Sequence, residues 1–155
     1  MTDPLIFSGI EVFSLGVEKL FAVVTDLELL AAAVPDVSAA QRVDERTLRC
    51  VVRPGFAFLR GTLKTVIQIA ELQPPAAAVL QIHSTGIGAT VGITSRLQLV
   101  AQGAETTELH WSAEVTELKG LVATLSRPLI HAAAERTISG VWQQLRARLE
   151  TSSAS

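Results

Sequence analysis

The sequence has no tyrosine, a single cysteine and few charged residues, and each of these shortages narrows what the chain can do. Cys50 has no second cysteine with which to form an internal disulfide, which is typical of a reducing compartment. The missing tyrosine removes one common general acid from the candidates for catalysis. Lysine and arginine number 13 against 15 aspartate and glutamate, so the chain lacks the basic excess that indicates nucleic-acid binding.

Long apolar runs are also missing. No stretch reaches the ~18 consecutive apolar residues that a membrane-spanning helix needs. The first residues, MTDPLIFSGIEVF, place an acid and a proline where a signal peptide has basic residues and then an apolar run. These features predict a cytoplasmic protein, and peripheral contact with the inner face of the membrane stays open as an alternative.

Apolar side chains, by contrast, are abundant. Of the 155 residues, 48% are hydrophobic and only 18% are charged, and the mean hydropathy is +0.38. A chain of this length forms one domain with a sizeable core. We therefore expect a single domain over residues 1–150 and a disordered tail over residues 151–155. The apolar excess indicates a large interior, a buried oligomer face or contact with lipid.

Residue periodicity predicts an α+β fold. Residues 5–13 are expected to form a first strand, and residues 17–33 two short helices, because Thr25 and Asp26 can end one helix and cap the next. Six further strands are predicted at residues 37–44, 47–54, 58–72, 77–86, 91–100 and 106–115. Apolar and polar residues alternate along most of them, which is typical of an antiparallel sheet with one buried face. Helices that are segregated from a run of strands indicate the α+β class.

The C-terminal region is predicted to be a long helix that is interrupted near Pro128. Apolar residues within 118–129 share one helical stripe, and those within 130–149 share another stripe almost opposite to it. A straight helix cannot turn both stripes toward one sheet, and proline in a helix interior forces a kink. We therefore predict a bend or a break near Pro128, where Ser126 can cap a second helix.

Small residues in this helix and in the strands favour a cavity between them. They are Ala132, Ala133 and Ala134 in the helix, and Gly86, Gly88, Ala89 and Gly92 in the strand region that is expected opposite. A curved sheet lifts away from a helix at its middle, where alanine side chains are too small to fill the gap. We predict an apolar cavity of ligand size at this place. The alternative is that helix and sheet simply touch.

Four segments of the chain carry a family resemblance. They are an opening with Gly9, Leu20, Phe21, Asp26 and the tetrapeptide AVPD; the segment RPGFAFLRG, which matches at Pro54 and Gly61; the glycine-rich STGIGATVG; and the helix start VATLSRPLI. In this order they resemble the CoxG-like family, named after the CoxG subunit of carbon monoxide dehydrogenase, within the START-like, or SRPBCC, helix-grip superfamily. The resemblance covers about residues 5–149. The chain departs from the family pattern at Phe21 in place of tryptophan, at Asp36 in place of glycine, and at Pro128.

The resemblance implies a helix-grip fold, in which a curved antiparallel sheet of about seven strands wraps around a long, kinked C-terminal helix, with two short helices after the first strand. It also implies a cavity for a lipid, sterol or quinone-like molecule, and an accessory role beside a molybdenum hydroxylase of the carbon monoxide dehydrogenase type. We expect a carrier without catalytic residues, metal or cofactor. The alternatives are a cofactorless cyclase or dehydratase in the same cavity, with His131 as acid or base, and a structural adaptor without a ligand.

The residues expected to line the cavity are apolar except for one imidazole. His131 is expected to hold a carbonyl or hydroxyl group of the ligand, against the alternative of a histidine that is satisfied by a backbone carbonyl. The other expected lining residues are Phe21, Phe56, Leu63, Ile67, Ile82, Ile93, Leu97, Trp111, Ala134 and Ile138. His83 and His110 alternate outward, and three histidines without a paired spacing do not indicate a metal site.

The outer face of the predicted sheet also carries apolar side chains. Val51, Val66 and Val100 alternate to that face and are compatible with a homodimer contact. The alternatives to a homodimer at this face are a protein partner and the membrane.

Overall fold

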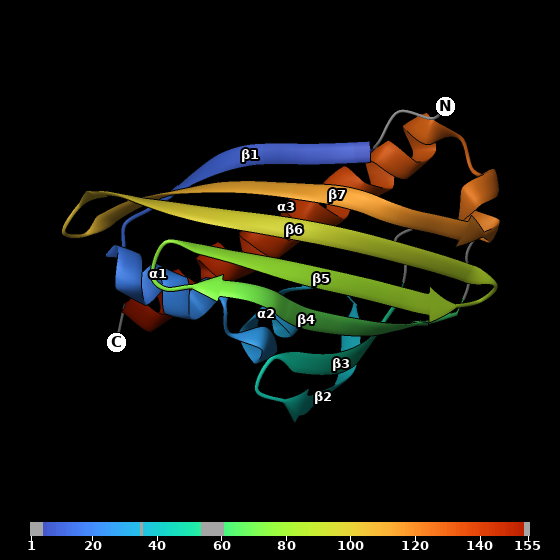
Figure 1. The fold of residues 1–155 in the computed structure, drawn as a ribbon, viewed down its shortest axis with the longest axis horizontal. Coiled ribbons are helices and arrows are strands. Elements are labelled where there is room, and N and C mark those ends of the chain that lie inside the picture. The colour runs from blue at the N-terminus through green and yellow to red at the C-terminus, as the bar shows by residue number, and fades with distance from the viewer. Residues whose placement is uncertain (1–4, 35, 54–60, 154–155) are drawn as a thin grey trace.

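The computed structural model describes residues 5–34, 36–53 and 61–153 of the chain. Within these ranges the chain forms seven strands and three α-helices, and a short 3-10 helix, η1 (Leu121–Thr124), precedes the last α-helix (Figure 1). The strands are β1 (Leu5–Phe13), β2 (Val37–Asp44), β3 (Thr47–Val52), β4 (Leu63–Gln73), β5 (Ala77–Gly86), β6 (Ala89–Gly103) and β7 (Thr106–Gly120). The helices are α1 (Val17–Val24), α2 (Leu27–Ala33) and α3 (Arg127–Ser153).

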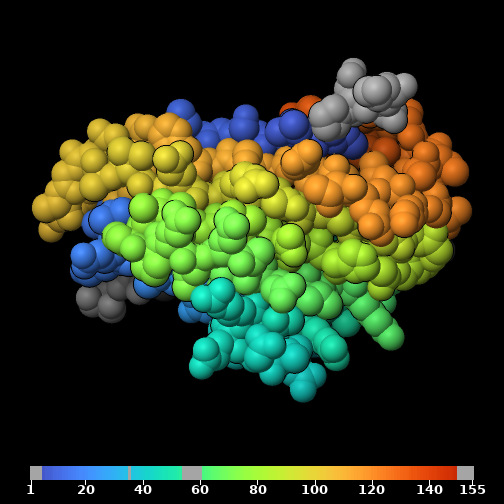
Figure 2. Space-filling view, in the orientation of Figure 1, coloured from blue at the N-terminus to red at the C-terminus, as the bar shows by residue number. Residues whose placement is uncertain are grey.

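The strands form one sheet in the order β1-β7-β6-β5-β4-β3-β2, and neighbouring strands are antiparallel. Strands β2 to β7 follow one another as neighbours, and β1 pairs with β7. The predicted α+β fold, with about seven strands and two short helices after the first strand, is confirmed. In the space-filling view the strands cover one face of the molecule and hide most of α3, so α3 crosses the opposite, inner face of the sheet (Figure 2).

The predicted change of helix at Thr25 and Asp26 is also confirmed. The carboxylate of Asp26 accepts hydrogen bonds from the backbone N–H groups of Glu28 (3.1 Å) and Leu29 (3.2 Å), and thereby caps the N-terminus of α2. The hydroxyl of Thr25 donates a hydrogen bond to the carbonyl of Phe21 (2.7 Å) at the end of α1. These local bonds end one helix and begin the next.

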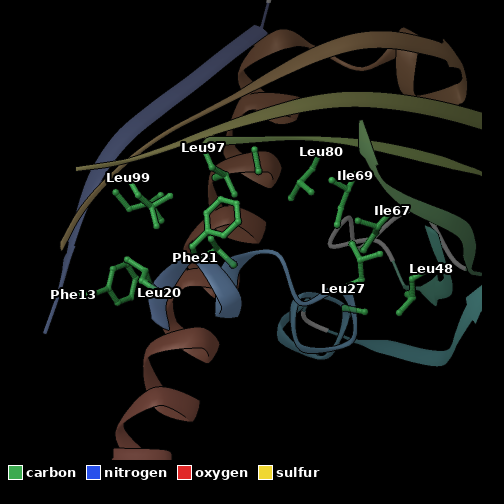
Figure 3. Close-up of a cluster of buried hydrophobic side chains, with 14 of the residues drawn as sticks. Phe13, Leu20, Phe21, Leu27, Leu48, Ile67, Ile69, Leu80, Leu97 and Leu99 are labelled. Carbon is green, nitrogen blue, oxygen red and sulfur yellow. The ribbon is translucent and has the colours of Figure 1, made fainter. Parts of the chain in front are cut away.

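The first core cluster joins α1 and α2 to the inner face of the sheet. Side chains from both helices and from several strands point toward one another (Figure 3). The buried members are Phe13, Leu20, Phe21, Val24, Leu27, Ala31, Leu48, Cys50, Ile67, Ile69, Ala78, Leu80, Leu97, Leu99 and Leu109. Side chains therefore fill the space between the sheet and these two short helices.

Several register shifts accompany the curvature of the sheet, and two of them are bulges within the long strands β4 and β7. Ala70 is an extra residue in β4, where this strand shifts register against β5. Thr116 is an extra residue in β7, where this strand shifts register against β6. A bulge bends its strand and increases the local twist, so these two positions help the sheet to curve around α3.

The predicted interruption near Pro128 is confirmed, and it takes the form of a break. α3 begins at Arg127, so Pro128 lies in its first turn, and the N–H of Leu129 donates a hydrogen bond to the Ser126 hydroxyl (3.4 Å). The prediction of helix from residue 118 onward is wrong, because residues 118–120 belong to β7. Pairing with the start of β6 continues to the end of β7, and this pairing outweighs the helical spacing of the apolar residues.

The small residues predicted to lie opposite the alanines of α3 have other neighbours. Gly86 (φ +147°) and Gly88 (φ +71°) lie at the β5–β6 turn, in conformations that favour glycine. A Cβ atom at Gly86 would lie 2.5 Å from the carbonyl oxygen of Thr62, and one at Gly88 would lie 3.6 Å from the side chain of Leu121. These two glycines therefore shape the turn, and they do not mark a space beneath α3.

Candidate functional site

A second core cluster joins the first half of α3 to the edge of the sheet. Its buried members are Leu5, Phe7 and Ile130. Partly buried residues that pack against it are Trp111, Ala113, Val115, Leu118, Leu125, Ala134 and Ile138. Trp111 also packs against the first cluster, so the two clusters meet at this residue.

The middle of the inner face is less buried than its margins. Ile67, Ile82, Ile93, Val115 and Leu5 are register partners that form one row across five strands. The end residues Ile67 and Leu5 are only 4% and 8% exposed, whereas the three residues between them are half-buried. In a filled core the middle of such a row would be the most buried part. The centre of the inner face is therefore less tightly covered than its margins.

Several apolar residues around this centre belong to neither core cluster. Among the described residues, Leu63, Val91 and Ile93 are half-buried and do not pack against the buried members of either cluster. Together with Ile82 and Ser95 they form the surface that we call the inner groove. It lies on the face of the sheet that α3 crosses, between the area covered by the first core cluster and the area covered by the second.

α3 contacts the sheet mainly through side chains. Within the described part of the chain, the α3 backbone comes close to α2. Fewer of its residues come close to any one strand than residues of the much shorter α1 come close to β6 or β7. Ala134 and Ile138 of α3 are half-buried and pack against the second core cluster. α3 therefore meets the sheet through its side chains, to which the small Ala134 contributes little volume.

Hydroxyl groups are the polar groups of this part of the inner face. Thr65 in β4 and Ser84 in β5 are register partners, and their hydroxyl oxygens lie 2.8 Å apart in a hydrogen bond. Ser95 lies in β6 on the same face and is half-buried. None of the five residues that define the inner groove is ionisable, so the surface suits an uncharged, largely apolar molecule.

A second hollow, the outer cleft, lies between β1 and α3 and has a volume of about 670 Å³. It is lined by Ile6, Phe7, Ser8, Glu11, Trp111, His131, Glu135, Ile138, Ser139, Trp142, Gln143 and Arg146. The guanidinium of Arg146 lies 3.1 Å from the carboxylate of Glu11 and donates a hydrogen bond to the carbonyl of Val12 (3.0 Å). The lining is polar along one side of α3, unlike that of the inner groove.

A third hollow, of about 600 Å³, surrounds the turn between β2 and β3. The backbone N–H of Arg46 donates a hydrogen bond to Asp44 there (2.9 Å), and this bond holds the pKa of the Asp44 carboxyl below its usual value. Charged and polar residues of the turn and of the adjacent strands make up most of its lining. This hollow therefore does not have the character of a site for an apolar ligand.

The expected lining residues occupy different parts of the structure. Leu63, Ile82 and Ile93 belong to the inner groove, whereas Ala134 and Ile138 pack against the second core cluster, and Ile138 also lines the outer cleft. Phe21, Ile67 and Leu97 are buried in the first core cluster. Trp111 joins both clusters. Phe56 lies outside the described residues. The groove residues that were not among the expected ones are Val91 and Ser95, although strand alternation places both on the same face as Ile93.

His131 lies in the outer cleft and not in the inner groove. Its side chain is 49% exposed, and its Nδ1 atom lies 3.5 Å from a carboxylate oxygen of Glu135. The imidazole ring lies against the ring of Phe7, with a centroid distance of 4.8 Å. His131 shares one side of α3 with Ile138, because seven positions along a helix make nearly two full turns, and this side lines the outer cleft.

In the described part of the chain, one buried side-chain nitrogen or oxygen lacks a hydrogen-bond partner. It is the indole Nε1 of Trp111. The described residues contain no group of three or more histidine, cysteine, aspartate or glutamate side chains that could hold a metal ion. None of the helices in the described ranges is long and apolar enough to cross a membrane.

Comparison with known proteins gives one family and several similar structures. The family described as the CoxG subunit of carbon monoxide dehydrogenase matches residues 12–150. No curated protein matches the sequence. A conserved protein from Geobacillus kaustophilus has a TM-score of 0.85 at 19% identity, over 96% of this chain and 97% of that one.

Two further structures have lower scores. A START superfamily protein from Mycobacterium smegmatis has a TM-score of 0.72 at 16% identity, over 94% of this chain and 97% of that one. The Zhui aromatase/cyclase from Streptomyces sp. R1128 has a TM-score of 0.71 at 14% identity, over 96% and 94% of the two chains. At these identities the likeness concerns the fold, and it confirms the START-like helix-grip architecture.

Proposed function

Because the chain belongs to the carbon monoxide dehydrogenase CoxG family, we propose that it binds a hydrophobic small molecule, lipid or quinone-like, in the inner groove beneath α3. The observation that supports this most is the half-buried centre of the inner face, where Ile82, Ile93 and Val115 lie between fully buried neighbours. Exposed apolar surface costs about 25 cal/mol per Å² relative to burial. A bound apolar molecule removes that cost.

The groove supports binding better than catalysis. Its five defining residues contain no acid or base, and His131, the candidate for that role, lies in the outer cleft beside Glu135. General acid–base catalysis needs such a group within hydrogen-bond reach of the reacting atoms. A carrier or accessory protein is therefore the function that we propose, and not a cyclase or dehydratase.

The lining that we propose combines the sheet and the helix. On the sheet it consists of Leu63, Ile82, Val91, Ile93 and Ser95, and on α3 it consists of Ala134 and Ile138. Phe21, Ile67 and Leu97 support it from the first core cluster, and Trp111 closes one side. This arrangement agrees with the general character of small-molecule sites, which are concave and apolar with few polar groups.

The binding proposal is tested by analysing what the protein carries. The protein is purified without detergent and extracted with organic solvent, and the extract is examined by mass spectrometry. We expect one class of lipophile in near-stoichiometric amount, absent from an unrelated protein prepared in parallel. If the extract is empty, and the protein takes up neither quinones nor fatty alcohols when they are supplied, the proposal is wrong.

The partner that the family name supports is a molybdenum hydroxylase of the carbon monoxide dehydrogenase type. We propose that the chain serves such an enzyme as an accessory protein, and that it delivers or receives the lipophile. Co-expression of a tagged chain with the hydroxylase subunits of the same organism, followed by affinity purification, tests this role. Recovery of the hydroxylase is expected; a hydroxylase that stays in the unbound fraction would leave a carrier without this partner.

A further inference from the structure

Ser95 is a polar residue in the middle of an apolar surface. In β6, Ile93 and Leu97 are its neighbours on the same face. Across the sheet its register partners are Leu80 in β5 and Ala113 in β7. Serine is mostly found at protein surfaces, so its presence at the centre of the inner face requires a reason other than packing.

The hydroxyl of Ser95 is both unpaired and accessible. The other two hydroxyls in this region, of Thr65 and Ser84, bond to each other. Among the described residues, Ser95 makes no side-chain hydrogen bond. Its oxygen is nevertheless not fully buried, because the one fully buried side-chain nitrogen or oxygen without a partner in these residues is Nε1 of Trp111. The oxygen of Ser95 is therefore unpaired and partly accessible on the inner face of the sheet.

The position of Ser95 defines one end of the inner groove. Beyond it along β6, Leu97 and Leu99 are buried in the first core cluster. In the other direction Ile93 and Val91 are half-buried and lie outside both clusters. The open surface thus runs from Ser95 to Val91, a distance of roughly 13 Å at the rise of a β-strand.

None of the five described residues that define this groove carries a positive charge. The defining residues are apolar apart from Ser95, and the cation of the outer cleft, Arg146, is already paired with Glu11 at 3.1 Å. A carboxylate or phosphate that was taken out of water without a counter-charge would be strongly disfavoured. A neutral hydroxyl or carbonyl needs only a single hydrogen-bond partner to enter the same place.

We propose that Ser95 is a specificity-determining residue that hydrogen-bonds the polar end of the ligand. The ligand is then an uncharged lipophile with a hydroxyl or carbonyl group at one end, and this end lies deepest in the groove. Its apolar remainder lies along Ile93, Val91, Ile82 and Leu63. This inference rests on the proposed function, because it names the chemical class of molecule that the same groove takes.

The experiment compares 1-decanol with decanoate, which differ in the charge of the polar end. Binding of each is measured by displacement of N-phenyl-1-naphthylamine fluorescence at neutral pH, for the wild-type protein and for Ser95→Ala, Ser95→Thr and Ser84→Ala. Unchanged urea unfolding midpoints would show that each variant is folded. Ser84→Ala is the matched control, because its hydroxyl is already bonded to Thr65.

We expect 1-decanol to bind the wild-type protein more tightly than decanoate does. Ser95→Ala should weaken 1-decanol binding about five- to tenfold, as expected for one hydrogen bond, while Ser95→Thr and Ser84→Ala should retain it. Equal binding of 1-decanol by the wild-type protein and Ser95→Ala would refute the role of Ser95, and decanoate binding as tight as that of 1-decanol would refute the neutral ligand. Either result leaves the proposed function standing, whereas the absence of any displacement would overturn both.

Discussion

The indole ring of Trp111 in β7 lies directly over Gly9 of β1, its register partner. A Cβ atom at residue 9 would lie 2.9 Å from Cζ2 of Trp111, which is closer than Cβ atoms approach other atoms in proteins. On its other side Trp111 meets Trp142 of α3, with ring centroids 5.8 Å apart. Glycine at residue 9 therefore permits the contact series that joins β1, β7 and α3 at the edge of the groove.

A first prediction follows from this contact. Gly9→Ala should lower the free energy of unfolding by about 1–3 kcal/mol, because the added methyl group displaces the Trp111 ring from a packed position. The control is Gly103→Ala in β6, where a Cβ atom would meet nothing within 4 Å. Urea unfolding followed by circular dichroism measures both. Equal effects of the two substitutions would mean that the ring is free to move.

A second prediction tests whether the centre of the inner face is open. Ile93→Phe should change the free energy of unfolding by less than about 1 kcal/mol, because the larger ring enters free space, and it should abolish uptake of the lipophile. Leu97→Phe, on the same face of the same strand but only 6% exposed, should cost about 1–3 kcal/mol through overpacking. Destabilisation of the same size in both variants would show that the space around Ile93 is filled.

A third prediction concerns the junction of the two short helices. Asp26→Ala removes the acceptor for two backbone N–H groups of α2 and should cost about 1 kcal/mol of stability. Asp26→Asn keeps a good N-cap acceptor and should cost much less. Thermal or urea unfolding of the two variants measures the difference. If both lose the same stability, the charge of Asp26 matters and its capping bonds do not.

A fourth prediction concerns the thiol of Cys50, which is only 3% exposed in the first core cluster. Burial raises the pKa of this thiol above its ordinary value of 9.0. The folded state then retains the proton at a pH where the unfolded chain has lost it. The contribution to stability is therefore complete below the pKa of the unfolded thiol and is lost as pH rises through the folded pKa.

Two measurements check the thiol. Stability of the wild-type protein should fall between about pH 8 and 10, and a Cys50→Ala variant, although less stable at pH 7, should show a smaller fall. The absence of tyrosine leaves fewer other groups that ionise in this range. Ellman's reagent should react slowly with the native protein and rapidly in guanidinium chloride. Rapid reaction of the native protein would place the thiol at the surface.

The features that the sequence predicted correctly depend on interactions between residues that are close together in the chain. The cap at Asp26 depends on a side chain that bonds backbone groups two and three residues away. The faces of the strands follow from a period of two, so the burial of Ile67 and Ile69 in β4 agrees with their alternation. The break near Pro128 follows from a ring that has no N–H to donate.

Features that depend on distant partners were not predicted. Residues 118–120 have the spacing of a helix but extend β7, because β6 lies beside them and pairs with their backbone. His131 is one position along α3 from the buried Ile130, and its place in the outer cleft depends on where Phe7 of β1 lies. Such distances between segments far apart in the chain cannot be read from the spacing of residues alone.

The sequence by itself determined the α+β class, the number of strands, the two short helices and the apolar character of the inner face, because each depends on neighbours within a few residues. The tertiary structure alone decided where that face is covered and where it is open. The short α1 and α2 pack closely over one part of the sheet, whereas α3 meets the remainder through fewer backbone approaches and through side chains such as Ile130 and Trp142. Whether apolar residues form a core or a binding surface depends on how far away the opposite surface lies.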